Sequence, residues 1–216
     1  MKNFLLIGLG RFGKFFAMKT AALGHQIMAV DINEERVNDV LPYVTNALIG
    51  DSSRQDFLES LGVTNYDACI VAIGDDFQKS LETTYLLKEL GAKKIVARAS
   101  QDIQKKFLLN NGADQVIYPE KALAEWTAVS LSSDKILDFV ALDDTYAVSE
   151  VVMPAKWIGK TLLDLDVRKR FNVNIIGAKD IKGTVKTLDP NDALRESDRL
   201  LVMGRNDDIV KLFRED

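Results

Sequence analysis

The chain has 216 residues, of which 47% are hydrophobic and 28% are charged, and its net charge is −4. These values are typical of a soluble globular protein, and the even spread of charge over both halves gives nucleic-acid binding no support. The one cysteine, Cys69, excludes an internal disulfide bond and fits a reducing cytoplasm; we expect it to be a small buried hydrophobe. No apolar run approaches the roughly 18 residues that span a membrane, so any membrane segments would belong to a partner.

Apolar, strand-like runs alternate with helical patterns through the first two thirds of the chain. We expect strands over residues 3–8, 25–31, 46–51, 66–74, 93–99 and 114–119. We expect helices over residues 11–24, 33–41, 53–62, 76–91, 101–112 and 119–133. The strands are apolar throughout rather than alternating, which is typical of parallel strands covered by helices on both faces. The pattern therefore predicts a doubly wound α/β domain with a Rossmann-type parallel sheet.

The pattern changes near residue 133. Short strands are expected over residues 135–142, 146–153, 172–179, 183–188 and 198–204, with helical candidates over 159–172 and 206–213. Residues 179–184 carry a hairpin signal around Gly183. We therefore expect a Rossmann nucleotide-binding domain over residues 1–133 and a small α+β domain over residues 134–216.

A glycine-rich turn follows the first expected strand. Gly8, Gly10 and Gly13 fit the pattern G-x-G-x-x-G, which allows a tight turn, a close approach of backbone to phosphate and close helix–strand packing. Asp31 ends the second strand, near the spacing at which a carboxylate bonds ribose hydroxyls. Its charge also disfavours NADP, because it would repel the 2′-phosphate. The alternative is that Asp31 only caps the following helix, although Asn33 is a plausible cap as well.

Arg11 is the most informative residue of this turn. The helix dipole disfavours a cation in the first helical turn, and a bound polyphosphate would reverse that preference. The alternative is a solvated arginine that points away. Further candidates follow the later strands, at the ends where ligands bind in such sheets: Asp51, Ile73, Gly74, Arg98 and Glu120. Glu120 could equally be a first-turn helix carboxylate with no other function.

The sequence offers little for catalysis. His25, the one histidine, lies at the start of the second strand, away from the glycine turn. There is no Tyr-x-x-x-Lys pair and no Cys, His and acid cluster at metal-ligand spacing. These absences favour a nucleotide-binding regulator, and an NAD-linked oxidoreductase is the alternative from another class.

Several motifs in order give the chain a family resemblance. They are IGLGRFG (7–13), AVDINEE (29–35), VAIGDD (71–76), LLKELGAKKIVARA (86–99), GADQVIYPEK (112–121), GKTLLDLDVRKRFNVNIIGAK (159–179) and DRLLVMG (198–204). With these motifs the chain resembles the RCK proteins (regulators of K⁺ conductance), especially the free gating subunits of bacterial Ktr and Trk potassium uptake systems.

The resemblance implies a regulatory protein that is not an enzyme. Such proteins are cytoplasmic homodimers that assemble into an octameric ring under an integral-membrane potassium channel subunit at the inner face of the membrane. ATP favours the open state and ADP the inactive one, with Mg²⁺ or Ca²⁺ beside ATP; some relatives bind NAD or NADH instead.

The resemblance also implies roles for individual residues. Arg11 would reach the γ-phosphate, Asp31 would hold the ribose, and Glu120 would be the metal ligand that places the cation. Ile73 and Gly74 would line the adenine pocket. The whole expected nucleotide site is Gly8, Gly10, Arg11, Phe12, Gly13, Asp31, Asn33, Asp51, Ser52, Ile73, Gly74, Arg98 and Glu120.

The second domain of this family often holds a second ligand at its dimer interface, which in Gram-positive relatives is cyclic di-AMP. Arg168 and Arg170 would contact its phosphates, and Asn174 and Ile175 its bases. The alternative is a helix with a solvated basic face that leads into a core strand.

Overall fold

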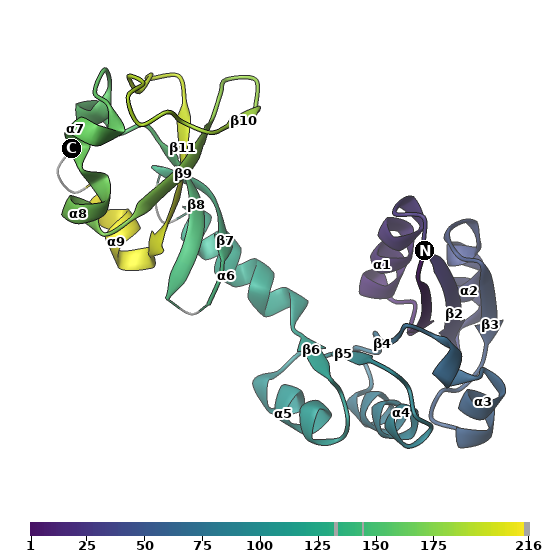
Figure 1. The fold of residues 1–216 in the computed structure, drawn as a ribbon. Helices are drawn as coiled ribbons and strands as arrows, with labels where there is room; N and C mark the ends of the chain where they lie inside the picture. Colours follow the sequence, from purple (N-terminus) through teal and green to yellow (C-terminus); the bar gives the residue numbers. More distant parts are fainter. Residues whose placement is uncertain (132–133, 144, 214–216) are drawn as a thin grey trace. The chain divides into compact units, whose positions relative to one another are not determined.

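A computed structural model of the chain describes residues 1–131, 134–143 and 145–213. The chain divides into two compact units, Met1–Ala122 and Leu123–Asp216 (Figure 1). The division falls inside helix α6 (Pro119–Leu131), which begins in the first unit and continues into the second. The domain boundary at residue 133 stays a prediction.

Six parallel strands form the sheet of the first unit in the order β3-β2-β1-β4-β5-β6. The strands are β1 (Asn3–Ile7), β2 (Gln26–Asp31), β3 (Asn46–Ile49), β4 (Ala68–Val71), β5 (Ile95–Arg98) and β6 (Gln115–Ile117). The helices are α1 (Arg11–Ala22), α2 (Glu34–Val40), α3 (Gln55–Ser60), α4 (Phe77–Glu89) and α5 (Asp102–Asn110), with one-turn helices η1 (Leu41–Tyr43) and η2 (Val63–Asn65). This topology confirms the doubly wound, Rossmann-type sheet.

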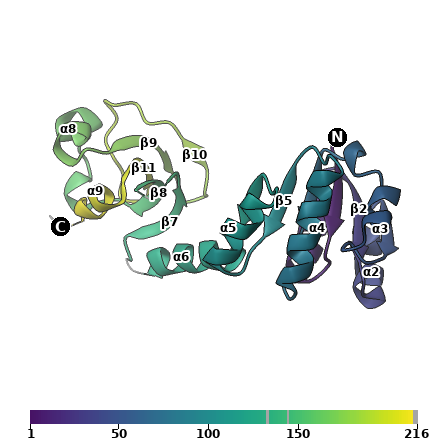
Figure 2. The ribbon, with the colours of Figure 1, turned by 90° about the horizontal axis from the view of Figure 1, so that it is seen from below.

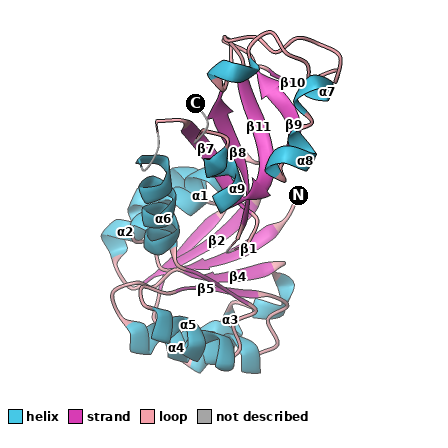
Figure 3. Cartoon of the chain, turned by 90° about the vertical axis from the view of Figure 1, so that its left-hand side faces the viewer, coloured by secondary structure: helices cyan, strands magenta, loops and turns pink. Residues whose placement is uncertain are grey.

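The sheet of the first unit lies between two layers of helices. Because successive residues of a strand point to opposite faces, Leu5 packs in a cluster with Leu87 of α4, whereas its neighbour Leu6 packs with Ala17 of α1. Figure 3 shows α1 and α2 on one face of the sheet and α3, α4 and α5 on the other. The chain therefore changes face between β1 and β4, and the carboxyl ends of these two strands form the switch point where ligands bind in such folds.

Strand β3 departs from the expected burial. Leu48 is 43% exposed and Ile49 is 53% exposed, although the sequence predicts strands buried on both faces. That prediction is wrong for β3, because β3 is the edge strand and pairs with β2 alone. An apolar run therefore identified the strand correctly but not its position in the sheet.

The second unit contains a five-stranded antiparallel sheet in the order β10-β9-β11-β8-β7 (Figure 2). Its strands are β7 (Ile136–Ala141), β8 (Tyr146–Val152), β9 (Asn174–Lys179), β10 (Val185–Lys186) and β11 (Arg199–Arg205). Its helices after α6 are η3 (Ala155–Trp157), α7 (Leu162–Leu165), α8 (Val167–Phe171) and α9 (Asn206–Lys211). This arrangement confirms the small α+β unit.

The single helix expected over residues 159–172 is instead two short helices, α7 and α8. Asp166 lies between them with φ +43°, and Asn172 ends α8 with φ +57°. Both residues are in the left-handed region, which interrupts a right-handed helix and which Asp and Asn tolerate better than most side chains. The expected hairpin at Gly183 (φ +82°) is confirmed, because β9 and β10 pair on either side of it.

The burial expected for the one cysteine is confirmed. Cys69 is completely buried in β4, and burial raises the pKa of its thiol to about 12. Among the residues that the structure describes, none of the helices combines the length and apolar character required to cross a bilayer.

Candidate functional site

The glycine turn joins β1 to α1 at the switch point of the sheet. Gly8 has φ +94°, and a Cβ there would lie only 2.8 Å from the backbone carbon of Ala72 at the end of β4. A Cβ on Gly13 would overlap the carbonyl oxygen of Gly8. By contrast, a Cβ on Gly10 would meet nothing within 4 Å. Packing thus explains Gly8 and Gly13, whereas the space beside Gly10 is open for a ligand phosphate.

Helix α1 begins without any negative group. Its N-cap, Gly10, provides no side-chain hydrogen bond, and its first turn holds no acidic residue. Every other described helix of six residues or more has a side-chain cap or a carboxylate in its first turn. Because Arg11 adds a cation at the positive end of the helix dipole, this end of α1 is suited to a polyphosphate.

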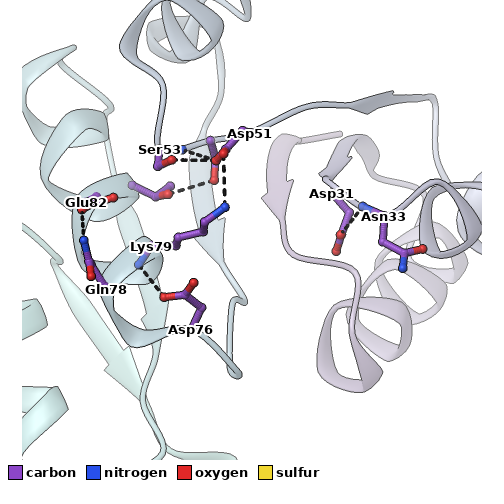
Figure 4. A network of polar contacts seen from close by, with 10 residues as sticks. Asp31, Asn33, Asp51, Ser53, Asp76, Gln78, Lys79 and Glu82 are labelled. Atoms are coloured by element: carbon purple, nitrogen blue, oxygen red, sulfur yellow. Dashed lines mark hydrogen bonds and ion pairs between the residues drawn. The ribbon is translucent and has the colours of Figure 1, made fainter.

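Asp31 holds the glycine turn in place. Asp31 is 6% exposed, and its carboxylate accepts a hydrogen bond from the backbone amide of Leu9 at 2.6 Å. It accepts a second from the backbone amide of Asn33 at 2.9 Å (Figure 4). The side chain of Asn33 caps α2 by accepting from the amide of Arg36 at 3.1 Å. The alternative that Asp31 caps α2 is therefore wrong. Arg36, which sequence reasoning missed, lies 3.9 Å from both Asp31 and Asp75 and so connects the segments after β2 and β4.

Asp51 follows β3 and is held by its neighbours. It accepts from the hydroxyl of Ser53 at 2.7 Å and its amide at 3.1 Å, and Lys79 of α4 lies 3.2 Å away (Figure 4). The hydrogen bonds from Ser53 and then the Lys79 ammonium keep the pKa of Asp51 below its ordinary value. Ser52 is buried, with its hydroxyl 2.9 Å from that of Thr83, so its side chain belongs to the interior.

Arg98 and Glu120 form an ion pair at the ends of β5 and β6. Arg98 donates from Nη2 to Oε1 of Glu120, and its side chain is 17% exposed, compared with 55% for Glu120. A Cβ on Gly74 would overlap the guanidinium of Arg98, so that group lies against the Gly74 backbone. The Nε of Arg98 is buried and has no hydrogen-bond partner among the described residues.

Glu120 is a carboxylate surrounded by positive charge. Burial raises its pKa, but hydrogen bonds from its own amide and Arg98, with the charges of Arg98 and Arg11, lower the pKa below its ordinary value. The described residues contain no cluster of three or more His, Cys, Asp or Glu side chains that could hold a metal ion. A cation beside Glu120 would therefore take phosphate oxygens and water as its other ligands, which is how proteins commonly hold Mg²⁺.

The structure thus brings most of the predicted nucleotide site to one edge of the first unit. Three predicted side chains turn inward instead. Phe12 packs against the core and its ring stacks on Phe16, with ring centres 6.3 Å apart. Ile73 also packs against a core cluster, and the Ser52 hydroxyl faces Thr83. Lys79 and Arg36 were missed because nothing local in the sequence shows that they reach carboxylates on distant segments of the chain, Asp51 and Asp75.

A pocket of about 160 Å³ lies in the second unit. It is lined by Tyr146, Arg168, Asn172, Asn174, Met203 and Gly204. Two of the four predicted residues, Arg168 and Asn174, are among them. The other two are elsewhere: the guanidinium carbon of Arg170 is 5.2 Å from the ring centre of Phe171, and Ile175 packs against the core.

Comparisons with known proteins find relatives over nearly the whole chain. Residues 4–119 match the TrkA-N domain and residues 147–215 match the TrkA-C domain. The Ktr system potassium uptake protein A of Bacillus subtilis is 38% identical over 214 residues, which cover 99% of this chain and 96% of the relative. The Ktr system potassium uptake protein C of the same organism is 37% identical over 210 residues, covering 97% of this chain and 95% of the relative.

Solved structures share the fold at low sequence identity. The crystal structure of the GsuK RCK domain matches with a TM-score of 0.68 at 17% identity, over 99% of this chain and 47% of that chain. The GsuK channel bound to NAD matches with a TM-score of 0.69 at 17% identity, over 98% of this chain and 38% of that one. This chain therefore spans less than half the length of those two proteins.

Proposed function

The chain belongs to the family of proteins that combine a TrkA-N with a TrkA-C domain, and we propose that it is the cytosolic regulatory subunit of a potassium uptake system of the Ktr or Trk type. In this proposal it is not an enzyme: it opens or closes a membrane channel subunit according to the nucleotide it holds. The identity of 37–38% to two Ktr system proteins over nearly the whole chain supports the proposal.

The observation that carries the nucleotide part of the proposal is the start of α1, where Arg11 lies at an uncapped helix end near the Arg98–Glu120 pair. ATP differs from ADP by one phosphate, so only groups that touch the γ-phosphate can distinguish them. Arg11 would bind that phosphate, and Glu120 would help to hold Mg²⁺ or Ca²⁺ against it. ATP would favour the conducting state and ADP the inactive one.

Assembly and location belong to the same proposal. The subunit would form homodimers, and these an octameric ring, in the cytoplasm at the inner face of the membrane, where the channel subunit anchors it. The free energy that couples nucleotide binding to channel opening is ordinarily about 1–3 kcal/mol per site, and in a ring the contributions of identical sites would add.

The pocket of the second unit is proposed to take part of a cyclic dinucleotide such as cyclic di-AMP. Arg168 supplies a cation for phosphate and Asn174 an amide for a base. A volume of about 160 Å³ is below the roughly 300–1,000 Å³ of small-molecule sites, so a second subunit would have to complete the site. The Arg168→Ala variant should abolish the heat of cyclic di-AMP binding in calorimetry; unchanged binding would remove Arg168 from the site.

An NAD(H)-responsive regulator is the second candidate, favoured by the shared fold with the NAD-bound GsuK channel. Thermal shifts with ATP, ADP, NAD and NADH, with and without Mg²⁺, separate the two, because a ligand that binds the folded state raises its stability. Hydride transfer by the protein alone would instead indicate an NAD-linked oxidoreductase.

The Arg11→Ala variant tests the γ-phosphate role directly. Hydrogen bonds to charged groups contribute about 1.5–3 kcal/mol, so ATP affinity should fall about 10- to 100-fold while ADP affinity changes little. Lys14→Ala is the matched control, since Lys14 lies in the same helix and pairs with Asp39 at 2.8 Å. Calorimetry with each nucleotide measures the affinities, and equal losses for ATP and ADP would contradict the role of Arg11.

A further inference from the structure

Arg98 connects two segments that are far apart in the sequence. It is the last residue of β5, and its guanidinium lies against the backbone of Gly74, which follows β4. The same guanidinium donates a hydrogen bond to Glu120, in the first turn of α6. One nitrogen of the planar guanidinium faces Gly74 and another bonds Glu120, an arrangement that the single ammonium of a lysine does not reproduce.

The burial of this side chain argues for more than a surface ion pair. Arg98 is 17% exposed, and its Nε is enclosed without a hydrogen-bond partner among the described residues. Leaving a buried donor unpaired is unfavourable, and such a group in a native structure calls for an explanation. The guanidinium also lies too close to the Gly74 backbone for a side chain at residue 74, because a single added carbon there would displace it.

We propose that Arg98 is a positioning residue that couples the segment after β4 to the first turn of α6. The inference rests on the proposed function and on the family resemblance, which implies that Ile73 and Gly74 line the adenine pocket. A ligand that shifts the Gly74 backbone shifts the guanidinium, and the guanidinium holds Glu120 and hence the first turn of α6. This helix passes from the first compact unit into the second, so its first turn is where a nucleotide signal would leave the site.

A neighbouring ion pair provides the matched control. Lys121, also in the first turn of α6, lies 3.0 Å from Asp102 of α5. This ion pair joins the first turn of α6 to α5, whereas the Arg98–Glu120 pair joins that turn to the guanidinium that lies against Gly74. If ordinary anchoring of α6 were sufficient, losing either pair would have the same consequence.

Amide hydrogen exchange in the full-length protein tests the proposal. The segment to follow is 118–124, which includes the hydrogen bond from the Ala122 amide to the Tyr118 carbonyl in the first turn of α6. In the wild type, saturating ATP with Mg²⁺ should change exchange at this segment at least about fivefold, the lower end of ordinary allosteric coupling. Arg98→Lys and Gly74→Ala, each saturated with nucleotide, should lose this change, whereas Lys121→Ala should keep it.

The measured quantity is the ratio of exchange rates with and without nucleotide. A merely structural role of Arg98 would alter both rates and leave their ratio unchanged. An undiminished ratio in Arg98→Lys and Gly74→Ala would overturn the inference while leaving the proposed function intact. If no adenine nucleotide stabilises the wild type in thermal-shift measurements, the proposed function fails, and the inference fails with it.

Discussion

Replacing Asp31 should destabilise the first unit even when no nucleotide is present. The buried carboxylate accepts from the amides of Leu9 and Asn33, at 2.6 and 2.9 Å, and so fixes the glycine turn to the end of β2. A residue that served only to hold a ribose would leave the ligand-free protein unaffected when replaced. The stability of the ligand-free protein therefore reports the scaffold role alone.

The magnitude follows from the two bonds. Hydrogen bonds to a charged group contribute about 1.5–3 kcal/mol each. Asp31→Asn keeps one oxygen and turns an amino group toward the other amide, so the expected loss is about 1.5–3 kcal/mol. Asp31→Ala leaves both amides without an acceptor, and the loss should be about twice as large. Since whole domains are stable by only about 5–15 kcal/mol, the second variant is expected to be marginal.

Urea unfolding measures the effect, provided that the probe reports the first unit. Both tryptophans, Trp126 and Trp157, lie in the second unit. Circular dichroism reports the helices and strands of both units, so unfolding of the first unit is the part of that signal that tryptophan fluorescence does not follow. Tryptophan fluorescence then serves as an internal control. Asp39→Asn, which removes a surface ion pair with Lys14, should shift the midpoint much less. A wild-type midpoint for Asp31→Asn would refute the reasoning and leave ribose binding as the only role of this carboxylate.

Two further predictions follow from the geometry. Gly13→Ala should lower the melting temperature of the ligand-free protein, because its Cβ would overlap the Gly8 carbonyl. Gly10→Ala should leave that melting temperature unchanged and weaken ADP binding. Equal changes in melting temperature for the two variants would contradict the assignment of Gly13 to packing and Gly10 to ligand binding. Although burial raises the pKa of Glu150, its hydrogen bonds to Lys179 and Arg199 hold it below the ordinary value. The contribution of ionised Glu150 to the free energy of unfolding is therefore fully present above the ordinary glutamate pKa, about 4.3. It is lost as the pH falls through the lower pKa that Glu150 has in the folded protein. Unfolding followed by tryptophan fluorescence should show this acid loss in the wild type and less of it in Glu150→Gln; equal slopes would exclude Glu150 as the source.

Local patterns in the sequence were sufficient for the architecture of the first unit. The apolar run of β1, the glycines and Asp31 lie close together in the chain, and their spacing fixes a strand, a turn and a helix start without knowledge of the remainder. The alternation of strands and helices then restricts the topology, because crossovers between parallel strands are right-handed. The order of the six strands agrees with that expectation.

Contacts between distant segments could not be predicted in this way. The pairing of Arg98 with Glu120 depends on the neighbouring positions of β5 and β6, and the exposure of Leu48 depends on β3 being at the edge of the sheet. Ser52 follows a strand at the ligand edge, yet its side chain turns inward to Thr83. The break at Asp166 was equally hidden, because an aspartate is compatible with both a helix and a left-handed turn.

The dual position of Asp31 is compatible with nucleotide binding. A carboxylate offers about four acceptor positions, and the two backbone amides occupy one on each oxygen. By this count, a ribose hydroxyl that reaches Asp31 would not have to displace either amide. Arg11 and Glu120 differ, because they are exposed and their charges interact across the turn. Ribose recognition by Asp31 would then be common to ATP, ADP and NAD, whereas discrimination by phosphate charge would fall to Arg11 and Glu120.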